Sequence, residues 1–228
     1  MSIFIYDDKM SYLKSVYNIF KKSYFNAIKN KKKFNVFLSG GSTPLELYDY
    51  IISKKSHQKI KWDKINFFFG DERFLPYDSS DSNFGNTKKH FFDHLKGYDL
   101  HLYPVKTDLS IDKSVENYEK IIRQKKATSP DLVLLGMGDD GHTASLFPDS
   151  EILNSKKLID YVENYGNPKT NRVSITFNLI NRAEKIVVFS KFKNKEKIIQ
   201  HLIFQNEEKK YPVEKIERKK TKYIFMRE

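Results

Sequence analysis

Short apolar runs alternate along the chain with longer segments whose apolar residues recur every three or four positions. Four runs have the length of buried strands: residues 34–38, 65–69, 132–135 and 186–189. The helical spacing covers residues 12–28, 44–52, 112–125 and 198–203. A further helix ending near Leu95 and a short strand near Leu102 are expected between them. This alternation predicts an α/β fold with a mostly parallel, Rossmann-like sheet covered by helices on both faces.

Length and composition favour one domain. The 228 residues suffice for a single α/β domain, which we expect to span residues 1–228. No run approaches the roughly 20 apolar residues that cross a bilayer, and the first residues lack a secretory pattern. Cysteine is absent, which excludes disulfides, thiolate chemistry and cysteine metal sites. We therefore expect a cytoplasmic protein with no membrane partner.

The net charge of +12 raises the question of a polyanion partner. The lysine clusters at residues 29–33, 191–197 and 209–220 are scattered along the chain at expected helix ends and turns. This scatter favours a solvated surface, so no nucleic-acid partner is expected. A modest positive field would still attract a small phosphorylated substrate.

Three of the expected strands end in polar turns that contain glycine. These turns are residues 39–43, 70–73 and 136–142. In an open parallel sheet, ligands bind beyond the carboxyl ends of the strands, where such turns meet. A single glycine turn is usually a tight connection into a helix, but three on one side of a sheet indicate a binding site.

The first turn combines Gly40, Gly41, Ser42 and Thr43. It offers free backbone N–H groups, two hydroxyls and a helix N-terminus, which suit an anion or the oxygens of a sugar. Thr43 is expected to cap a helix whose first residue is Pro44. The turn is not a P-loop, because the Gly-Lys-Ser/Thr ending is missing.

The third turn carries Asp140 and His142. Among six histidines, His142 is the only one in a glycine-flanked loop at a strand end. A histidine side chain, whose ordinary pKa is about 6.5, can accept a proton from water at neutral pH. The residue types leave three roles open for His142: a general base, a histidine bonded to the loop backbone, or a metal ligand together with Asp140 or Asp71.

Three motifs follow one another along the chain. Residues 38–44 read LSGGSTP, residues 71–73 read DER with Ser82-Asn83 after them, and residues 135–148 read LGMGDDGHTASLFP. In this order they closely resemble 6-phosphogluconolactonases over nearly the whole chain. The resemblance implies a fold shared with glucosamine-6-phosphate deaminase and ribose-5-phosphate isomerase. It also implies hydrolysis of 6-phospho-D-glucono-1,5-lactone in the oxidative pentose phosphate pathway, with no obligatory cofactor. Because the chain has no cysteine and only one well-placed histidine, we also expect no metal.

The resemblance also implies roles for single residues. His142 corresponds to the family's general base, and Asp140 is the candidate carboxylate that orients it. Arg73 resembles a substrate-binding arginine, although an ion pair with Asp71 or Glu72 is the alternative. Asp71 and the turn formed by Gly40, Gly41, Ser42 and Thr43 are expected to contact the substrate as well.

Two further cations correspond to phosphate contacts. Arg172, expected just before a strand at residues 173–175, matches the first contact. Lys195, at the start of the last long helix, matches the second, with Lys193 and Lys197 as alternatives in the same register. The tail from Tyr223 onward has no assigned function.

Glucosamine-6-phosphate deaminase is the nearest rival on the same fold. Its loop resembles Asp-Gly-His followed by a glutamate, whereas residues 143–148 here contain no carboxylate. The lactonase is therefore favoured, and a non-catalytic anion-binding protein on the same fold is the alternative from another class. The expected partner is a small phosphorylated sugar lactone, and the expected state is a monomer or weak oligomer.

Overall fold

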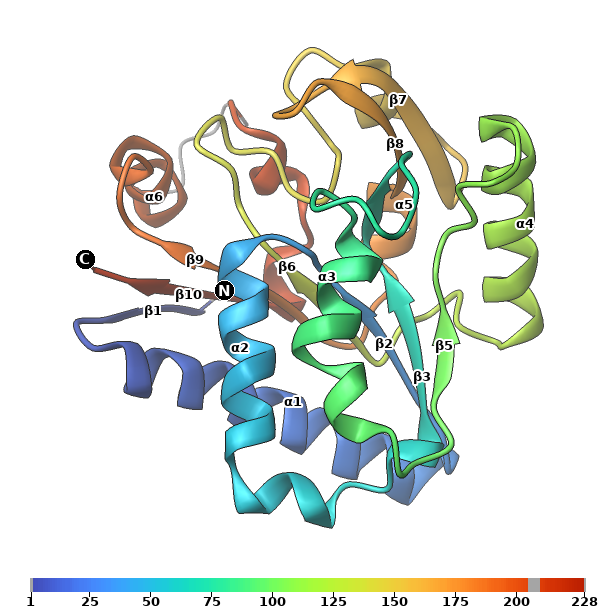
Figure 1. Cartoon of the computed structure of the whole chain (residues 1–228). Helices are drawn as coiled ribbons and strands as arrows, with labels where there is room; N and C mark the ends of the chain where they lie inside the picture. The colour runs from blue at the N-terminus through green and yellow to red at the C-terminus, as the bar shows by residue number, and fades with distance from the viewer. Residues whose placement is uncertain (1, 205–209, 228) are drawn as a thin grey trace.

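A seven-stranded parallel sheet forms the centre of the molecule in this computed structural model, which describes residues 2–204 and 210–227. The strand order is β1-β10-β9-β6-β2-β3-β5, with every neighbouring pair parallel (Figure 1). The α/β class expected from the sequence is confirmed. The strands are β1 (Ser2–Tyr6), β2 (Phe34–Leu38), β3 (Ile65–Phe69), β5 (His101–Tyr103), β6 (Leu132–Leu135), β9 (Ile186–Lys191) and β10 (Thr221–Met226).

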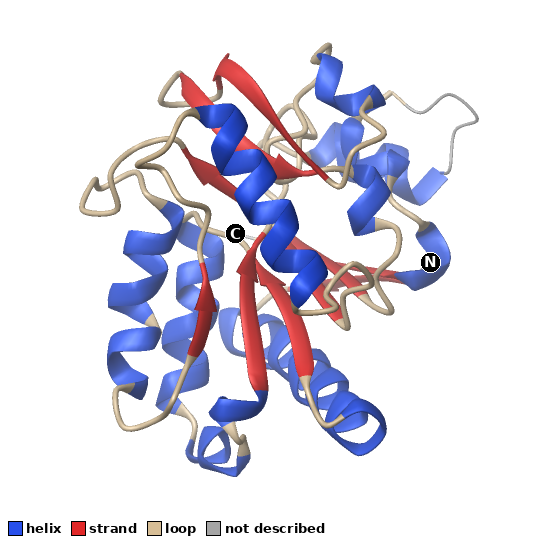
Figure 2. Cartoon of the chain, turned by 90° about the vertical axis from the view of Figure 1, so that its right-hand side faces the viewer, coloured by secondary structure: helices blue, strands red, loops and turns tan. Residues whose placement is uncertain are grey.

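Helices cover both faces of this sheet, as Figure 2 shows. One face carries α1 (Lys9–Lys31), α2 (Ser42–Ser53) and α3 (Asn83–His90), and the other carries α4 (Ile111–Gln124), α5 (Phe177–Ile180) and α6 (Glu196–Phe204). Short 3-10 helices join them: η1 (Lys55–Lys59), η2 (Trp62–Lys64), η3 (Phe92–Leu95), η4 (Glu151–Asn154), η5 (Pro212–Lys215) and η6 (Arg218–Lys220). No helix of the described residues is long and apolar enough to cross a membrane.

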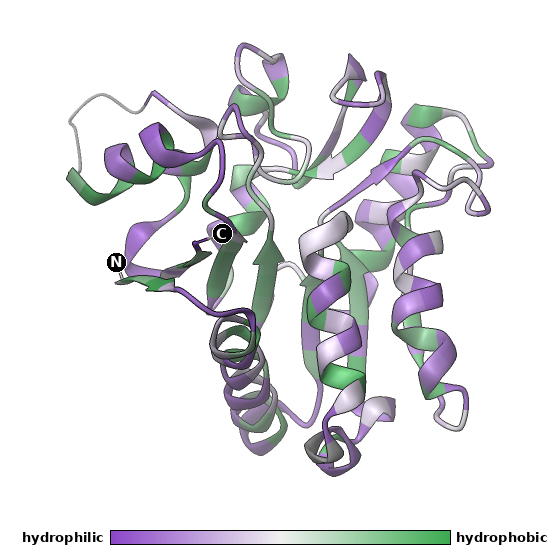
Figure 3. Ribbon diagram, turned by 60° about the vertical axis from the view of Figure 1, so that its left-hand side comes forward, coloured by the Kyte–Doolittle hydropathy of each residue, from purple (hydrophilic) through white to green (hydrophobic). Residues whose placement is uncertain are grey.

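The strands of the central sheet are buried on both sides. Side chains alternate across a strand, so Val36 of β2 packs in one core layer and Phe37 in the other. A strand buried in this way reads as a continuous apolar run, which is why the sequence pattern located β2, β3, β6 and β9. In Figure 3 these central strands are green, whereas the covering helices carry purple residues as well.

Both ends of the chain form strands that the sequence pattern missed. β10 lies between β1 and β9, and its Tyr223, Ile224 and Phe225 are completely buried. The apolar part of β10 follows a lysine-rich stretch and is too short to stand out. The backbone N–H of Arg227 donates to the carbonyl of Tyr6 (2.8 Å), so the two ends lie side by side.

A second sheet lies over the carboxyl ends of the central strands, at the top of Figure 1. It is antiparallel, with the order β4-β8-β7 for β4 (Asp71–Arg73), β7 (Ile159–Tyr165) and β8 (Thr170–Ile175). Two predictions are corrected here: residues 71–73 form a strand rather than a turn, and Arg172 lies inside β8 rather than before it. Gly70 joins the two sheets, because its N–H donates to Leu38 of β2 and its carbonyl accepts from Ile175 of β8.

Helix α2 begins one residue before the predicted cap. Gly41 is the N-cap, with a φ of 89°, and its carbonyl accepts the N–H of Leu45 (3.2 Å). The expectation that Thr43 caps this helix was therefore wrong, because glycine can adopt the left-handed backbone that the sharp entry requires. Pro44 lies in the first turn, where a missing N–H leaves no bond unmade.

Candidate active site

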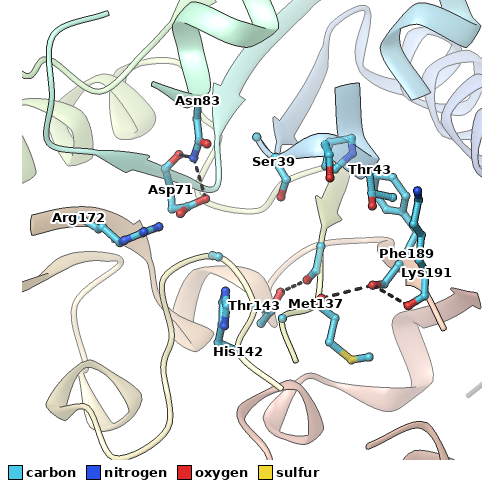
Figure 4. Close-up of a pocket in the computed structure, with 18 of the residues that line it drawn as sticks. Ser39, Thr43, Asp71, Asn83, Met137, His142, Thr143, Arg172, Phe189 and Lys191 are labelled. Atoms are coloured by element: carbon cyan, nitrogen blue, oxygen red, sulfur yellow. Dashed lines mark hydrogen bonds between the residues drawn. The ribbon is translucent and has the colours of Figure 1, made fainter. Parts of the chain in front are cut away.

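A cavity of about 300 Å³ opens where the loops after β2 and β6 meet. β2 and β6 are parallel neighbours, so both loops lie at the same edge of the sheet. Figure 4 shows side chains from β4, β8 and β9 around the same space. The expected site residues that line the cavity are Gly40, Gly41, Ser42, Thr43, Asp71, Arg73, His142, Arg172 and Lys195. Asp140 does not line this cavity but contacts His142.

The His142 imidazole is held by Asp140. Its Nδ1 lies 2.5 Å from Oδ1 of Asp140, and the same oxygen accepts the backbone N–H of His142 at 3.0 Å. Partial burial acts to raise the pKa of Asp140, but the two bonds from His142 outweigh it and hold this pKa below its ordinary value. Asp140 is therefore ionised at neutral pH and favours a proton on Nδ1, which leaves Nε2 to accept one.

Gly138 makes room for the imidazole. A Cβ at this position would lie 2.1 Å from Cε1 and 2.2 Å from Nδ1 of His142. The N–H of Gly138 also donates to the carbonyl of His142 (2.9 Å), so the loop folds back around the ring. Any larger residue would displace the imidazole or the backbone beside it.

Asp71 is buried at the start of β4 and is held by two side chains. Its Oδ2 accepts the hydroxyl of Ser145 (2.7 Å), and its Oδ1 accepts Nδ2 of Asn83 (3.2 Å). A Cβ on Gly40 would lie 1.9 Å from Oδ1 of Asn83, so this contact requires glycine. Sequence reasoning assigned no role to Asn83 or Ser145, although both lie within the quoted motifs.

Glu72 is completely buried and binds the N-terminus of α3. Its carboxylate accepts the backbone N–H groups of Asn83 (2.7 Å), Phe84 (2.8 Å) and Arg73 (2.9 Å). Burial raises the pKa of Glu72 to about 7, the bonds from Phe84 and Asn83 oppose the rise, and the charge of Asp71 adds to it. Glu72 thus orders the start of the helix that places Asn83 at the cavity.

The raised pKa of Glu72 predicts a pH-dependent stability. In the folded protein Glu72 keeps a proton that it loses in the unfolded chain above about pH 4.5. The stabilisation that this proton gives to the folded state is fully present below that pH and is lost as pH rises through about 7. Relative to a Glu72→Gln variant, the free energy of unfolding should fall by on the order of 3 kcal/mol across this window. Urea unfolding at a series of pH values measures it. Identical pH dependence in both proteins would contradict the prediction.

Arg172 is 3% exposed and is anchored to the tip of the β7–β8 hairpin. Its Nε donates to the carbonyl of Tyr165 (2.9 Å) and its Nη2 to that of Pro168 (3.1 Å). The guanidinium also lies 5.5 Å from the ring centroid of Phe147. A Cβ on Gly166 would come within 2.4 Å of Nη2, so glycine gives this side chain its space. Figure 4 shows the guanidinium pointing towards the cavity.

Arg73 pairs with Arg172 across β4 and β8. Its Nη1 donates to the carbonyl of Asp81 (2.6 Å), and its buried Nε has no hydrogen-bond partner among the described residues. The bond between Arg73 and Glu72 comes from the backbone N–H, so the alternative of a side-chain ion pair with that residue finds no support. Like charges on opposed residues repel one another, and an anion bound at Arg172 would reduce this repulsion.

The sequence left open whether Lys193, Lys195 or Lys197 reaches the site, and in the structure it is Lys195 that lines the cavity. Its side chain is 12% exposed, lines the cavity and places Nζ 2.6 Å from Oδ1 of Asp139. Lys193 and Lys197 are exposed and do not line the cavity. Lys191, at the end of β9, also lines it. Sequence reasoning gave Lys191 no role in the site, although it stands two positions after the strand predicted at residues 186–189.

The metal-ligand alternative for His142 lacks a set of ligands. Within residues 2–204 and 210–227, no three His, Asp or Glu side chains converge in a way that could hold an ion. Asp140 bonds Nδ1 of His142, and Asp71 faces Ser145 and Asn83 instead. An imidazole oriented by a carboxylate, with one ring nitrogen left for proton exchange, is the arrangement of a general base.

Comparison with known proteins identifies the family. The model described as "Glucosamine-6-phosphate isomerases/6-phosphogluconolactonase" matches residues 7–225. The chain is 40% identical to a 6-phosphogluconolactonase of Thermotoga maritima over 169 residues, 74% of each protein. It is 34% identical to the 6-phosphogluconolactonase of Chlamydia pneumoniae over 195 residues, 84% of this chain and 74% of that protein.

A solved structure agrees with this match. The crystal structure of 6-phosphogluconolactonase from Thermotoga maritima superposes with a TM-score of 0.86 and 30% identity, covering 100% of this chain and 99% of that one. Both the sequence and the fold therefore place this chain in the family of glucosamine-6-phosphate isomerases and 6-phosphogluconolactonases.

Proposed function

We propose that this protein hydrolyses 6-phospho-D-glucono-1,5-lactone to 6-phosphogluconate, a step of the oxidative pentose phosphate pathway. The observation that carries the proposal is the His142–Asp140 pair at a cavity whose wall also contains Arg73, Arg172 and Lys195. A base beside several cations suits a substrate with a hydrolysable ester and a phosphate. The relatives from Thermotoga maritima and Chlamydia pneumoniae carry the name of this activity.

In the proposed mechanism, Nε2 of His142 removes a proton from water as the water oxygen attacks C1 of the lactone. The carbonyl becomes a tetrahedral oxyanion, and Asp140 stabilises the imidazolium. The oxyanion then collapses, the bond from C1 to the ring oxygen breaks, and the imidazolium returns its proton to that oxygen. Backbone N–H groups of Gly40 and Gly41, which line the cavity, are the candidate donors to the oxyanion.

The phosphate does not react, so its contacts serve to hold C1 beside His142. We assign these contacts to Arg172 and Lys195. The planar guanidinium of Arg172 can bind two phosphate oxygens at once, and its anchoring to backbone carbonyls pre-organises it. Asp71 and Arg73 are assigned to the rest of the substrate, because both line the same cavity.

The contacts of His142 favour the lactonase over the deaminase. An aldose isomerisation needs further acid–base groups near the histidine, and the sequence after His142 provides none up to Pro148. In the folded protein, the ring of Phe147 lies 4.4 Å from that of His142, centroid to centroid. An apolar ring thus packs on the histidine from the stretch where the deaminase loop carries its glutamate.

The proposal predicts a specific activity. The purified protein should accelerate hydrolysis of freshly generated 6-phosphogluconolactone, followed spectrophotometrically and corrected for spontaneous opening. It should release no ammonia from glucosamine 6-phosphate, and its rate should survive exhaustive chelation. Ammonia release at a comparable rate would overturn the assignment in favour of the deaminase. Loss of activity on chelation, restored by one divalent ion, would replace the general base with metal-bound water.

Gly138→Ala should impair the chemical step specifically. The added Cβ would displace the His142 ring, and a misplacement of this size lowers kcat by roughly 10- to 100-fold while KM changes little. Gly97→Ala is the control, because a Cβ there meets nothing within 4 Å and the residue does not line the cavity. Lactone hydrolysis by the two variants is compared under identical conditions. Equal kcat values in the two variants would show that the position of the His142 imidazole does not affect the chemical step.

We further propose that the enzyme works in the cytoplasm, as a monomer or weak oligomer and without nucleic acid. Several of its basic side chains are already paired with acidic ones, such as Lys31 with Asp131 and Glu184. Retention on DNA that salt abolishes and sugar phosphates do not affect would instead favour a nucleic-acid-binding role.

A further inference from the structure

The ammonium group of Lys195 already has an anionic partner. Oδ1 of Asp139 lies 2.6 Å from Nζ of Lys195, at the wall of the cavity. We propose that Asp139 competes with the phosphate of the substrate for Lys195: it pairs with the ammonium in the free protein and gives way when a phosphate binds. The identity of the phosphate ligand rests on the function proposed above, whereas the competition rests on this contact.

The two partners differ in exposure, which decides which one moves. The side chain of Lys195 is 12% exposed, whereas that of Asp139 is 62% exposed. An exposed carboxylate can turn into water at little cost, since surface ion pairs contribute about 0–1 kcal/mol. The largely covered ammonium cannot leave the cavity wall as readily. An incoming phosphate would therefore displace the carboxylate of Asp139, while Lys195 stays in place and binds the phosphate.

Asp139 can move without disturbing the candidate base. The loop around it is tied by bonds that do not involve its side chain: Gly138 N–H to the His142 carbonyl, Asp140 to the imidazole, and the Thr143 hydroxyl to the Gly136 carbonyl. Rotation of the Asp139 side chain breaks none of these. The exchange is thus confined to the phosphate contact.

The surroundings of Lys195 favour an anion in either state. The first turn of α2, with Ser42 and Thr43, lines the same cavity and favours a negative charge there. Asp139 supplies that anion when no ligand is bound. Because the competition acts equally on every ligand that carries a phosphate, it weakens the binding of substrate and of product alike. It therefore favours product release.

Calorimetric titration with 6-phosphogluconate and with inorganic phosphate tests the proposal. Asp139→Asn should bind both ligands roughly 3- to 5-fold more tightly than the wild-type protein, because the competing charge is gone. Gluconate, which lacks the phosphate, should bind both proteins equally. Glu196→Gln is the matched control: it removes the same charge from the exposed residue next to Lys195, and it should change these dissociation constants less than twofold.

A second background separates the contact from a general charge effect. In Lys195→Met, adding Asp139→Asn should alter phosphate affinity no more than adding Glu196→Gln does. Unchanged or weaker binding by Asp139→Asn, or the same tightening without Lys195, would overturn the inference. If Asp139→Asn tightens phosphate binding but the wild-type protein hydrolyses no lactone, the proposed function fails and the competition stands. If the wild-type protein hydrolyses the lactone but Asp139→Asn does not change phosphate affinity, the proposed function stands and only the competition is overturned.

Discussion

Replacing His142 with alanine is expected to lower kcat for lactone hydrolysis by about 10²- to 10⁴-fold. KM should change far less, because only the proton transfer is lost while the cations that hold the phosphate come from other strands and loops. The variant should also still bind 6-phosphogluconate. Steady-state kinetics, corrected for spontaneous hydrolysis, and calorimetric titration with the product measure the two effects.

His90→Ala is the matched control for this substitution. His90 forms a comparable surface pair with Asp49 (3.0 Å) but does not line the cavity. The lowered pKa of Asp140 keeps this carboxylate ionised at neutral pH, so it can hold the imidazole of His142 in place. If His142→Ala kept a kcat near that of the wild type, the base would lie elsewhere, and Asp71 would be tested next.

Arg172→Ala should raise KM strongly, by roughly 10- to 100-fold. A charge-assisted contact to the phosphate is lost from the ground state and the transition state alike, so kcat should fall much less. The effect is measured with the phosphorylated lactone over a substrate range that extends well above the wild-type KM.

Controls for Arg172→Ala must address its structural bonds. Because the side chain also ties down the hairpin tip, the melting temperature is measured in parallel. Arg172→Lys keeps the charge without the planar fork, and an intermediate KM is expected. Arg182→Ala removes an exposed arginine and should leave KM unchanged. An unaltered KM in a folded Arg172→Ala protein would move the phosphate site elsewhere.

The central sheet was predictable because its strands are buried on both faces. Runs such as Leu132–Leu135 carry no polar residue and end at glycine, which is a strong local signal. The prediction failed at the ends of the chain, where the buried residues of β10 are interrupted by Lys222. The second sheet gave no comparable signal, since β4 consists of three polar residues whose structure depends on pairing with β8.

The contacts of the candidate site also divide into those that the sequence predicts and those that only the folded protein makes. The sequence by itself determined the local part: Asp140 and His142 stand two positions apart in a glycine loop, and a contact that short depends mainly on the loop's own geometry. Tertiary structure decided the rest. Asp71 meets Ser145 across 74 positions of chain, Arg73 is placed opposite Arg172, and Lys195 rather than Lys193 reaches the cavity. Such contacts exist only once two sheets and their helices have packed, and no short-range pattern of residues encodes them.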